Sequence, residues 1–168
     1  MTRAITVRTD SAAATREVAA ALAPLLLPGD VVGLSGDLGA GKTCFVQGAA
    51  AALGVERRVT SPTFTIMRSY AGRLPIVHID VYRLDRLQDV LELGEEAVNA
   101  ADAVTFVEWG DAVASLLPAD RLDVTITTGP GDDERTLVLA PLGKWLARHT
   151  DLEAALAAWR PEAAQVGR

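Results

Sequence analysis

A chain of 168 residues is long enough for one domain with a substantial core but short for two. Apolar residues make up 49% of it and charged residues 23%, which indicates a folded, water-soluble protein and excludes a disordered one. The net charge of −6 argues against general nucleic-acid binding, because contact with the phosphate backbone draws on a positive surface. We therefore expect a single domain spanning residues 1–168.

Cysteine content and hydropathy exclude two further classes. Cys44 is the only cysteine, so neither an internal disulfide nor a cysteine-based zinc cluster is possible. The longest apolar run, residues 18–27, is interrupted by Pro24 and has about half the length of a membrane span. The first ten residues contain no apolar segment typical of a secretory signal. We expect a cytoplasmic protein without membrane contact.

The first half of the chain alternates between strand-like and helix-like patterns. In chain order these predict a strand at residues 4–9, a helix at about 12–23, a strand at 31–35 and a helix at about 42–53. Asp10 or Ser11 can cap the first helix, which is expected to stop at Pro24. Gly54 is the expected left-handed end of the second helix.

The second half predicts two β-hairpins and a further buried strand. In chain order we expect strands at 64–70 and 74–80, a helix at 84–99 interrupted near Gly94, a strand at 104–108 with a short helix to 117, and strands at 122–128 and 135–140. The hairpins turn around residues 71–73 and around the stretch GPGDDE. Thr150 to Glu153 have capping-box form for a last helix that ends before Pro161. Strands interleaved with helices, together with two hairpins, predict an α/β fold around a mixed sheet.

The stretch GDLGAGKT, residues 36–43, fits the P-loop pattern and lies between a predicted strand and a predicted helix. Its glycines allow backbone N–H groups to point at phosphate oxygens, and the helix N-terminus adds its dipole. The pattern assigns Lys42 to the β- and γ-phosphates of a nucleotide and the Thr43 hydroxyl to Mg²⁺. The residues expected to bind ATP here are Leu38, Gly39, Ala40, Gly41, Lys42, Thr43 and Cys44. Packing is the simpler role for Cys44, although a helix N-terminus can also activate a thiol.

Polar residues also gather in three later segments. TSPTFT, residues 60–65, forms a loop after the P-loop helix, and in HIDVYRL the side chains of His78, Asp80 and Tyr82 share one face of a strand. In FVEWG an apolar strand ends at Glu108. P-loop enzymes place their second magnesium ligand at such a strand end, so Thr43 and Glu108 are the predicted metal pair. The alternative for Glu108 is a solvated strand-end carboxylate.

The signatures of several other P-loop classes are missing. GTPases read guanine with an Asn-Lys-x-Asp loop, and the only asparagine here is Asn99. The LSGGQ signature of transporter-type ATPases is absent, because LSGD at Leu34 only introduces the P-loop. Small-molecule kinases usually carry an acceptor-binding insert with clustered arginines, whereas the arginines here are scattered. A free-standing kinase remains the alternative, and a nucleotide-dependent interaction module with negligible hydrolysis is a third.

Taken together, GDLGAGKT, SPTF, HIDVYRL and VEWG, in this order and spacing, resemble the TsaE family over about residues 11–135. The resemblance implies a P-loop NTPase-type three-layer fold and a small ATPase of bacterial threonylcarbamoyladenosine tRNA modification. ATP and Mg²⁺ are its implied cofactors. The proteins TsaB and TsaD are its implied partners, and these would handle the tRNA, which the chain itself meets only indirectly. SPTF replaces a familiar SPTY and Cys44 replaces a second threonine, and neither change removes a phosphate or metal ligand.

Roles for individual residues follow from the same resemblance. Asp80 and Glu108 are the catalytic candidates; Asp80 would position the attacking water, either as general base or within the metal shell. Ser61 and Thr63 resemble a switch loop that senses the γ-phosphate, with a proline-fixed turn as the alternative.

Further from the P-loop, Thr15 and Arg135 are expected to contact the nucleotide by family analogy alone. His78 is expected to be a hydrogen-bonded strand residue more than a catalyst. Trp109 is expected in the wall or core near the nucleotide.

Overall fold

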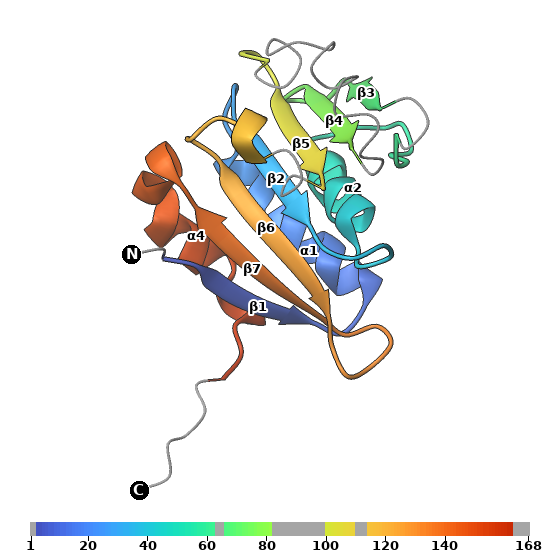
Figure 1. Ribbon diagram of the computed structural model, residues 1–168, viewed down its shortest axis with the longest axis vertical. Helices are drawn as coiled ribbons and strands as arrows, with labels where there is room; N and C mark the ends of the chain where they lie inside the picture. Colours follow the sequence, from blue (N-terminus) through green and yellow to red (C-terminus); the bar gives the residue numbers. More distant parts are fainter. Residues whose placement is uncertain (1–2, 63–65, 82–99, 110–113, 163–168) are drawn as a thin grey trace, which may run out of the picture.

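The computed structural model describes residues 3–62, 66–81, 100–109 and 114–162. Within these ranges seven strands form one sheet in the order β1-β7-β6-β2-β5-β4-β3 (Figure 1). The strands are β1 (Ile5–Thr9), β2 (Val31–Ser35), β3 (Met67–Tyr70), β4 (Ile76–Asp80), β5 (Val104–Glu108), β6 (Leu122–Thr128) and β7 (Arg135–Pro141). The α-helices are α1 (Ala12–Leu22), α2 (Lys42–Ala52) and α4 (His149–Ala155). Short 3-10 helices are η1 (Ala23–Leu25), η3 (Ala114–Leu116), η4 (Gly143–Arg148) and η5 (Ala157–Trp159).

The sheet has a parallel centre and antiparallel borders. Strands β6, β2, β5 and β4 pair in parallel, whereas β1 with β7, β6 with β7, and β3 with β4 pair antiparallel. The predicted α/β fold with a mixed sheet and two hairpins is therefore confirmed. Because the central strands run in the same direction, the carboxyl ends of β2, β5 and β4 meet at one edge, where the P-loop begins.

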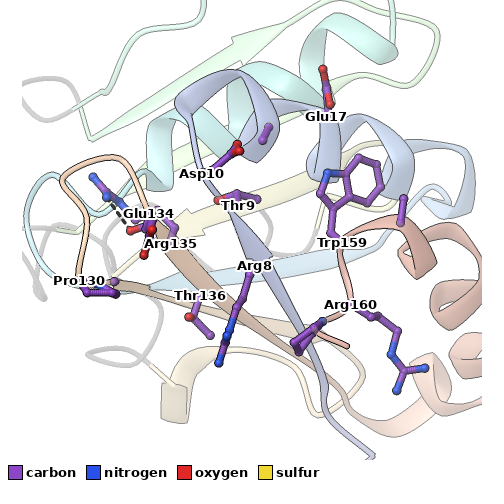
Figure 2. A pocket seen from close by; sticks show the side chains of 14 residues that line it. Arg8, Thr9, Asp10, Glu17, Pro130, Glu134, Arg135, Thr136, Trp159 and Arg160 are labelled. Atoms are coloured by element: carbon purple, nitrogen blue, oxygen red, sulfur yellow. Dashed lines mark hydrogen bonds between the residues drawn. The ribbon is translucent and has the colours of Figure 1, made fainter. Parts of the chain in front are cut away.

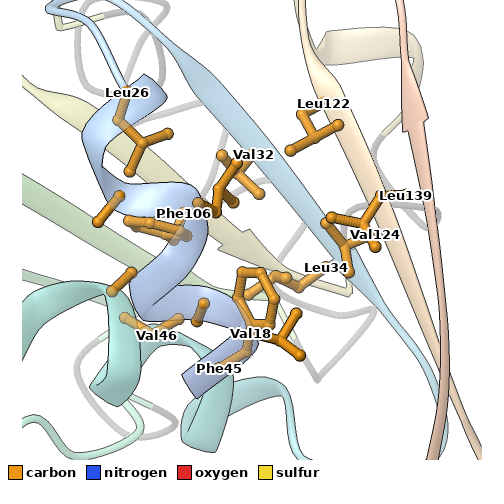
Figure 3. Close-up of a cluster of buried hydrophobic side chains, with 14 of the residues drawn as sticks. Val18, Leu26, Val32, Leu34, Phe45, Val46, Phe106, Leu122, Val124 and Leu139 are labelled. Atoms are coloured by element: carbon orange, nitrogen blue, oxygen red, sulfur yellow. The ribbon is translucent and has the colours of Figure 1, made fainter. Parts of the chain in front are cut away.

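The main hydrophobic core lies between the sheet and helices α1, α2 and α4. Figure 3 shows Val18 of α1 and Phe45 of α2 beside Leu34 of β2, and Phe106 of β5 and Leu152 of α4 belong to the same buried cluster. A smaller cluster on the opposite face includes Val107. The helix predicted at 84–99 falls outside the described residues, so the third layer of the predicted fold stays a prediction. None of the helices in the described ranges has the length and apolar character needed to cross a bilayer.

Helices α1 and α2 approach each other closely because of Gly48. A Cβ at this position would overlap the backbone of Arg16, including its carbonyl oxygen. The N-terminus of α1 is fixed by Ser11, whose Oγ accepts a hydrogen bond of 3.1 Å from the backbone N–H of Ala14. Ser11, and not Asp10, is thus the N-cap of α1. The close contact fixes the position of α2, and with it the start of the P-loop helix, against the rest of the core.

Two predicted strand boundaries in the first hairpin are wrong. Of the strand predicted at 64–70, residues 64 and 65 lie outside the described residues, and β3 is described from Met67, because Ile66 has φ +67° and so leaves the extended conformation. The strand predicted at 74–80 begins at Ile76, because Pro75 carries no backbone N–H to donate to a neighbouring strand.

Helix boundaries agree with the predictions only in part. Helix α1 ends at Leu22 with Ala23 as its C-cap, so the stop predicted before Pro24 is confirmed; Pro24 itself lies in the first turn of η1, which follows directly. The predicted capping box at Thr150 is wrong: η4 runs directly into α4, so Thr150 lies inside the helical segment, and Arg148 precedes α4 without a side-chain cap. Where a short helix reaching residue 117 is predicted, the described residues contain the 3-10 turn η3. Gly54 has φ +80° as expected for the end of α2.

Candidate nucleotide and magnesium site

The P-loop joins the end of β2 to the start of α2 at the edge where the parallel strands end. Gly41 precedes the helix with φ +114°, a conformation that residues with a Cβ rarely adopt. The first turn of α2 then presents backbone N–H groups that have no partner within the helix. Asp37, Leu38 and Gly39 are exposed, so the rim of the loop is open to a ligand from solvent.

Lys42 is buried inside the P-loop, with 5% of its surface exposed. Its Nζ donates hydrogen bonds to the carbonyl oxygens of Gly36 at 2.6 Å and Asp37 at 2.9 Å. The ammonium also lies 3.8 Å from the centre of the Trp109 ring, which is close enough for a cation–π contact. Trp109 has φ +64° and turns the chain directly after β5. The ring therefore lies beside the P-loop lysine, as expected for this residue, and its contact with a nucleotide stays a prediction.

Thr43 and Glu108, 65 positions apart in sequence, meet at this edge. The Thr43 hydroxyl donates a hydrogen bond of 2.6 Å to Oε1 of Glu108, whose residue is 3% exposed. A hydroxyl and a carboxylate are the hard oxygen ligands that Mg²⁺ prefers, and magnesium in nucleotide sites takes its other ligands from phosphates and water. This pair fits the predicted metal site. Within the described part of the chain no group of three or more His, Cys, Asp or Glu side chains is arranged to hold a metal ion without such outside ligands.

Asp80 lies next to Glu108 because the two residues are register partners in the parallel pair β4–β5. The residue is 3% exposed, and its Oδ2 accepts a hydrogen bond of 2.7 Å from the Ser61 hydroxyl. The backbone N–H of Asp80 also donates to the carbonyl of Ile66 at 2.8 Å. The segment that holds Ser61 is therefore tied to the strand that holds Asp80. Thr63, the other predicted switch residue, lies outside the described residues, as does Tyr82.

These groups surround a cavity of about 300 Å³. Its lining comes from the P-loop, the start of α2, the loop after α2 and the ends of β4 and β5. The lining residues are Leu38, Gly39, Gly41, Lys42, Thr43, Cys44, Ser61, Asp80, Glu108 and Trp109.

Thr15 on α1 and Arg135 on β7 both lie near the P-loop, but they make different contacts there. The hydroxyl of Thr15 is buried and forms a 2.9 Å hydrogen bond with the hydroxyl of Thr9, while its methyl group faces Gly41. The Arg135 guanidinium donates from Nε to the carbonyl of Ala40 at 2.9 Å and from a terminal nitrogen to that of Gly39 at 3.4 Å. Arg135 thus positions the outer half of the P-loop, and direct contact of either residue with a nucleotide stays a prediction.

Cys44 is half-buried beside the P-loop, and its thiol donates a hydrogen bond of 3.3 Å to the carbonyl of Ala12. Burial raises the pKa of this thiol, and the positive charges of Arg16 and Arg135 offset only part of that effect. A raised pKa disfavours the thiolate, so the packing role expected for Cys44 agrees with its surroundings better than a reactive role.

A second, larger cavity of about 750 Å³ lies between β1, α1, the β6–β7 turn and η5 (Figure 2). Its charged lining mixes Arg8 and Arg160 with Asp10 and Glu17, in contrast to the single lysine and helix N-terminus of the P-loop. Arg135 is the residue that touches both regions, since it lines this cavity and also binds P-loop carbonyls. The balanced charge makes this cavity a poor receptor for phosphate groups.

Comparison with known proteins agrees with the four motifs and the fold. The sequence model of the family described as "Threonylcarbamoyl adenosine biosynthesis protein TsaE" matches residues 9–137. The chain belongs to the TsaE family. The matched residues contain the whole P-loop and the three strand ends that meet there.

Individual TsaE proteins show the same similarity. A relative from Bacillus subtilis, named tRNA threonylcarbamoyladenosine biosynthesis protein TsaE, is 42% identical over 81% of this chain and 85% of its own. A Treponema pallidum relative of the same name is 46% identical over 61% of this chain and 76% of its own. The crystal structure of Bacillus subtilis YdiB superposes with a TM-score of 0.77 at 36% identity, covering 94% of this chain and 97% of that one.

Sequence reasoning missed two supporting contacts of the site. The hydrogen bond between Thr9 and Thr15 joins β1 to α1, and no motif signals it, although alternation along β1 already places Thr9 on the buried face. His78 is a hydrogen-bonded strand residue, as expected, but its partner was not predicted: Nε2 lies 2.8 Å from Oε1 of Glu108. Its signal was present, because His78 and Asp80 share a strand face and Asp80 neighbours Glu108 in register.

Proposed function

We propose that this TsaE-family chain is a magnesium-dependent ATP hydrolase of the tRNA threonylcarbamoyladenosine machinery, producing ADP and inorganic phosphate. The observation that carries the proposal is the 2.6 Å contact between Thr43 and Glu108 at the mouth of the P-loop. These two residues would hold Mg²⁺, which when bound offsets the charge of the β- and γ-phosphates. Lys42 would bind the same phosphates, because its ammonium already lies inside the loop.

Asp80 is the residue we assign to positioning the attacking water. It lies beside Glu108 in register, it is buried, and Ser61 donates to one of its oxygens. A carboxylate in this place can accept a proton from water or a hydrogen bond from a metal-bound water, and both roles put it at the reacting phosphate. Ser61 would then connect the state of the phosphate to the loop that precedes β3.

The proposed partners are TsaB and TsaD, with tRNA met only through them, and the proposed compartment is the cytoplasm. The net charge of −6 supports this division, because an acidic chain gains little from direct contact with a phosphate backbone. ATP hydrolysis would sustain repeated rounds of modification by changing how the chain associates with its partners.

Reconstitution tests this function directly. The chain is mixed with TsaB, TsaD, tRNA and the activated carbamoyl donor, and modified adenosine is counted per TsaD. We expect more than one round of modification only when the chain and ATP are both present. Phosphate should appear as inorganic phosphate; a phosphorylated small molecule would instead identify a kinase. Full function of a Glu108→Ala variant would indicate a nucleotide-dependent interaction module.

The role of Asp80 gives a sharper prediction. In Asp80→Asn, Ser61 keeps an oxygen to donate to, so we expect nucleotide affinity within about 3-fold of the parent chain while turnover falls about 100-fold or more. Affinity is measured by titration with a fluorescent ADP analogue and turnover by phosphate release. Asp151→Asn, an exposed change in the first turn of α4, is the matched control and should alter neither quantity. Equal losses of affinity and turnover would contradict the assignment.

A further inference from the structure

We propose that His78 is a positioning residue for the metal ligand: its imidazole holds the Glu108 carboxylate in the orientation that meets Thr43, and so sets the affinity for Mg²⁺. This inference rests on the proposed function, because Glu108 is a metal ligand only within it. The residue acts through Glu108 and needs no contact with nucleotide.

The geometry places His78 directly behind Glu108. His78 lies on β4 two positions before Asp80, and its register partner on β5 is Phe106, two positions before Glu108. Nε2 of His78 lies 2.8 Å from Oε1 of Glu108, and the histidine is fully buried. The carboxylate of Glu108 is therefore hydrogen-bonded to His78 on the core side and to Thr43 on the P-loop side.

Both bonds converge on one oxygen of the carboxylate. Among the described residues, the hydrogen bonds to Glu108 from Thr43 and from His78 both end on Oε1. Two donors on one oxygen fix the rotation of the carboxylate plane, and they leave Oε2 without a hydrogen bond to any of those residues. A metal ligand held this way loses little conformational entropy when the ion binds, which is how outer-shell partners of metal ligands raise affinity.

The surroundings of the other ring nitrogen, Nδ1, indicate that the function of His78 is its hydrogen bond to Glu108. A carboxylate only accepts hydrogen bonds, so the proton of the ring is assigned to Nε2 by its partner. Nδ1 is then buried without a hydrogen-bond partner within the described ranges, which is unfavourable for the fold. The position follows Ile76 on the same strand face, where an aliphatic side chain packs fully buried. Packing alone would favour an aliphatic residue here as well, so the bond to Glu108 is what the histidine adds.

Two amide variants separate positioning from packing. The amide nitrogen of His78→Gln reaches about as far as Nε2 and can still donate to Glu108, whereas that of His78→Asn falls short of Oε1. The affinity of a fluorescent ADP analogue is measured for each variant with Mg²⁺ and with EDTA, and the ratio gives the gain due to the metal. Thermal melting is recorded alongside. His149→Asn is the matched control, because it changes the chain's other histidine, buried beside Glu153 on α4.

We expect the metal-dependent gain in affinity to fall about 10-fold or more in His78→Asn and to stay within about 3-fold of the parent chain in His78→Gln and His149→Asn. Affinity in EDTA should be the same in all four proteins. Equal gains in the Gln and Asn variants would overturn the inference, as would loss of cooperative melting in both, which would assign His78 to folding alone. A parent chain that gains nothing from Mg²⁺ would instead contradict the proposed function, so the two failures are distinguishable.

Discussion

At the scale of single residues, Cys44 shows how burial and charge compete at the start of the P-loop helix. Its thiol lies near two guanidinium groups and a helix N-terminus, all of which favour a thiolate, yet burial is the larger effect and the pKa is raised. Desolvation therefore outweighs nearby positive charge at this position.

The raised pKa predicts slow alkylation of Cys44. At neutral pH the thiolate fraction is lower than for an ordinary cysteine, so the rate with iodoacetamide should be lower in the folded chain than in the same chain in denaturant. The rate should rise with pH only above the range in which a free cysteine already reacts. Since Cys44 is the only cysteine, total label reports it alone. Arg16→Ala removes a charge that lowers the pKa and should slow the reaction further; a faster reaction would contradict this account.

The residues of the site differ in how far the sequence predicts them. Thr43, Asp80 and Glu108 each end or begin an element within a recognisable motif, so their meeting follows from the parallel order of the strands. The four carbonyl contacts of Arg135 do not. Two of them lie within its own β6–β7 turn, and the other two join the start of β7 to Ala40 and Gly39 of the P-loop. Backbone carbonyls carry no sequence signal, so family analogy predicted a nucleotide contact for Arg135 and did not indicate these carbonyl partners.

At the scale of elements, the contact between α1 and α2 rests on the missing side chain of Gly48. In most helix interiors a change from glycine to alanine stabilises by about 0.5–1 kcal/mol, because glycine is the more flexible residue. Here the added Cβ would overlap the backbone of Arg16, which cannot move without shifting α1.

We therefore predict that Gly48→Ala destabilises the chain by about 1–3 kcal/mol, against the usual helix preference. Urea unfolding followed by circular dichroism measures the free energy of unfolding. Ala51→Gly, an exposed change in the same helix, is the comparison and should cost about 1 kcal/mol from helix propensity alone. A stabilised Gly48→Ala chain would show that the two helices can separate without cost.

The elements that sequence predicts best are the buried central ones. The bounds of β2, β5 and β6 agree with their predictions. β2 and β5 are largely apolar, β6 alternates apolar with polar residues, and all three are flanked by glycine, charged or turn residues. Prediction is poorest at the edges of the fold. The start of β3 was predicted too early because Ile66 is left-handed, and the start of α4 was mispredicted because η4 runs directly into it. In both places a tertiary contact decides the conformation against the local pattern, since Ile66 accepts the backbone N–H of Asp80 and Trp145 of η4 is buried in the core.

At the scale of the whole molecule, the segment after β7 is part of the core although the family match ends at residue 137. Leu152 and Leu156 are fully buried in the main cluster. Arg148 ties this segment to the loop before β2 through two hydrogen bonds to Asp30, at 2.6 and 2.8 Å. Its guanidinium also stacks 3.6 Å from the ring of Trp145.

Breaking this pair should destabilise the whole domain. Asp30→Ala leaves the Arg148 guanidinium without its counter-charge where its side chain is only 18% exposed, and we expect a loss of about 3–5 kcal/mol. Lys144→Ala, which removes an exposed pair with Asp120, should cost less than about 1 kcal/mol. Thermal melting measures the loss of stability in Asp30→Ala and in Lys144→Ala. In the double variant Asp30→Leu with Arg148→Met much of the loss should be recovered; no recovery would show that the pair itself, and not the stranded charge, stabilises the fold.

The position of β2 at the centre of the sheet has a consequence for synthesis on the ribosome. Its two neighbours are β5 and β6, so the strand that leads into the P-loop has no partner until β5, which ends at residue 108, has been made. At roughly 5–20 residues per second, an apolar strand and its glycine-rich loop wait for several seconds in the nascent chain. During translation this segment is the natural point for chaperone capture, and slowing elongation between residues 36 and 104 would lengthen its exposure.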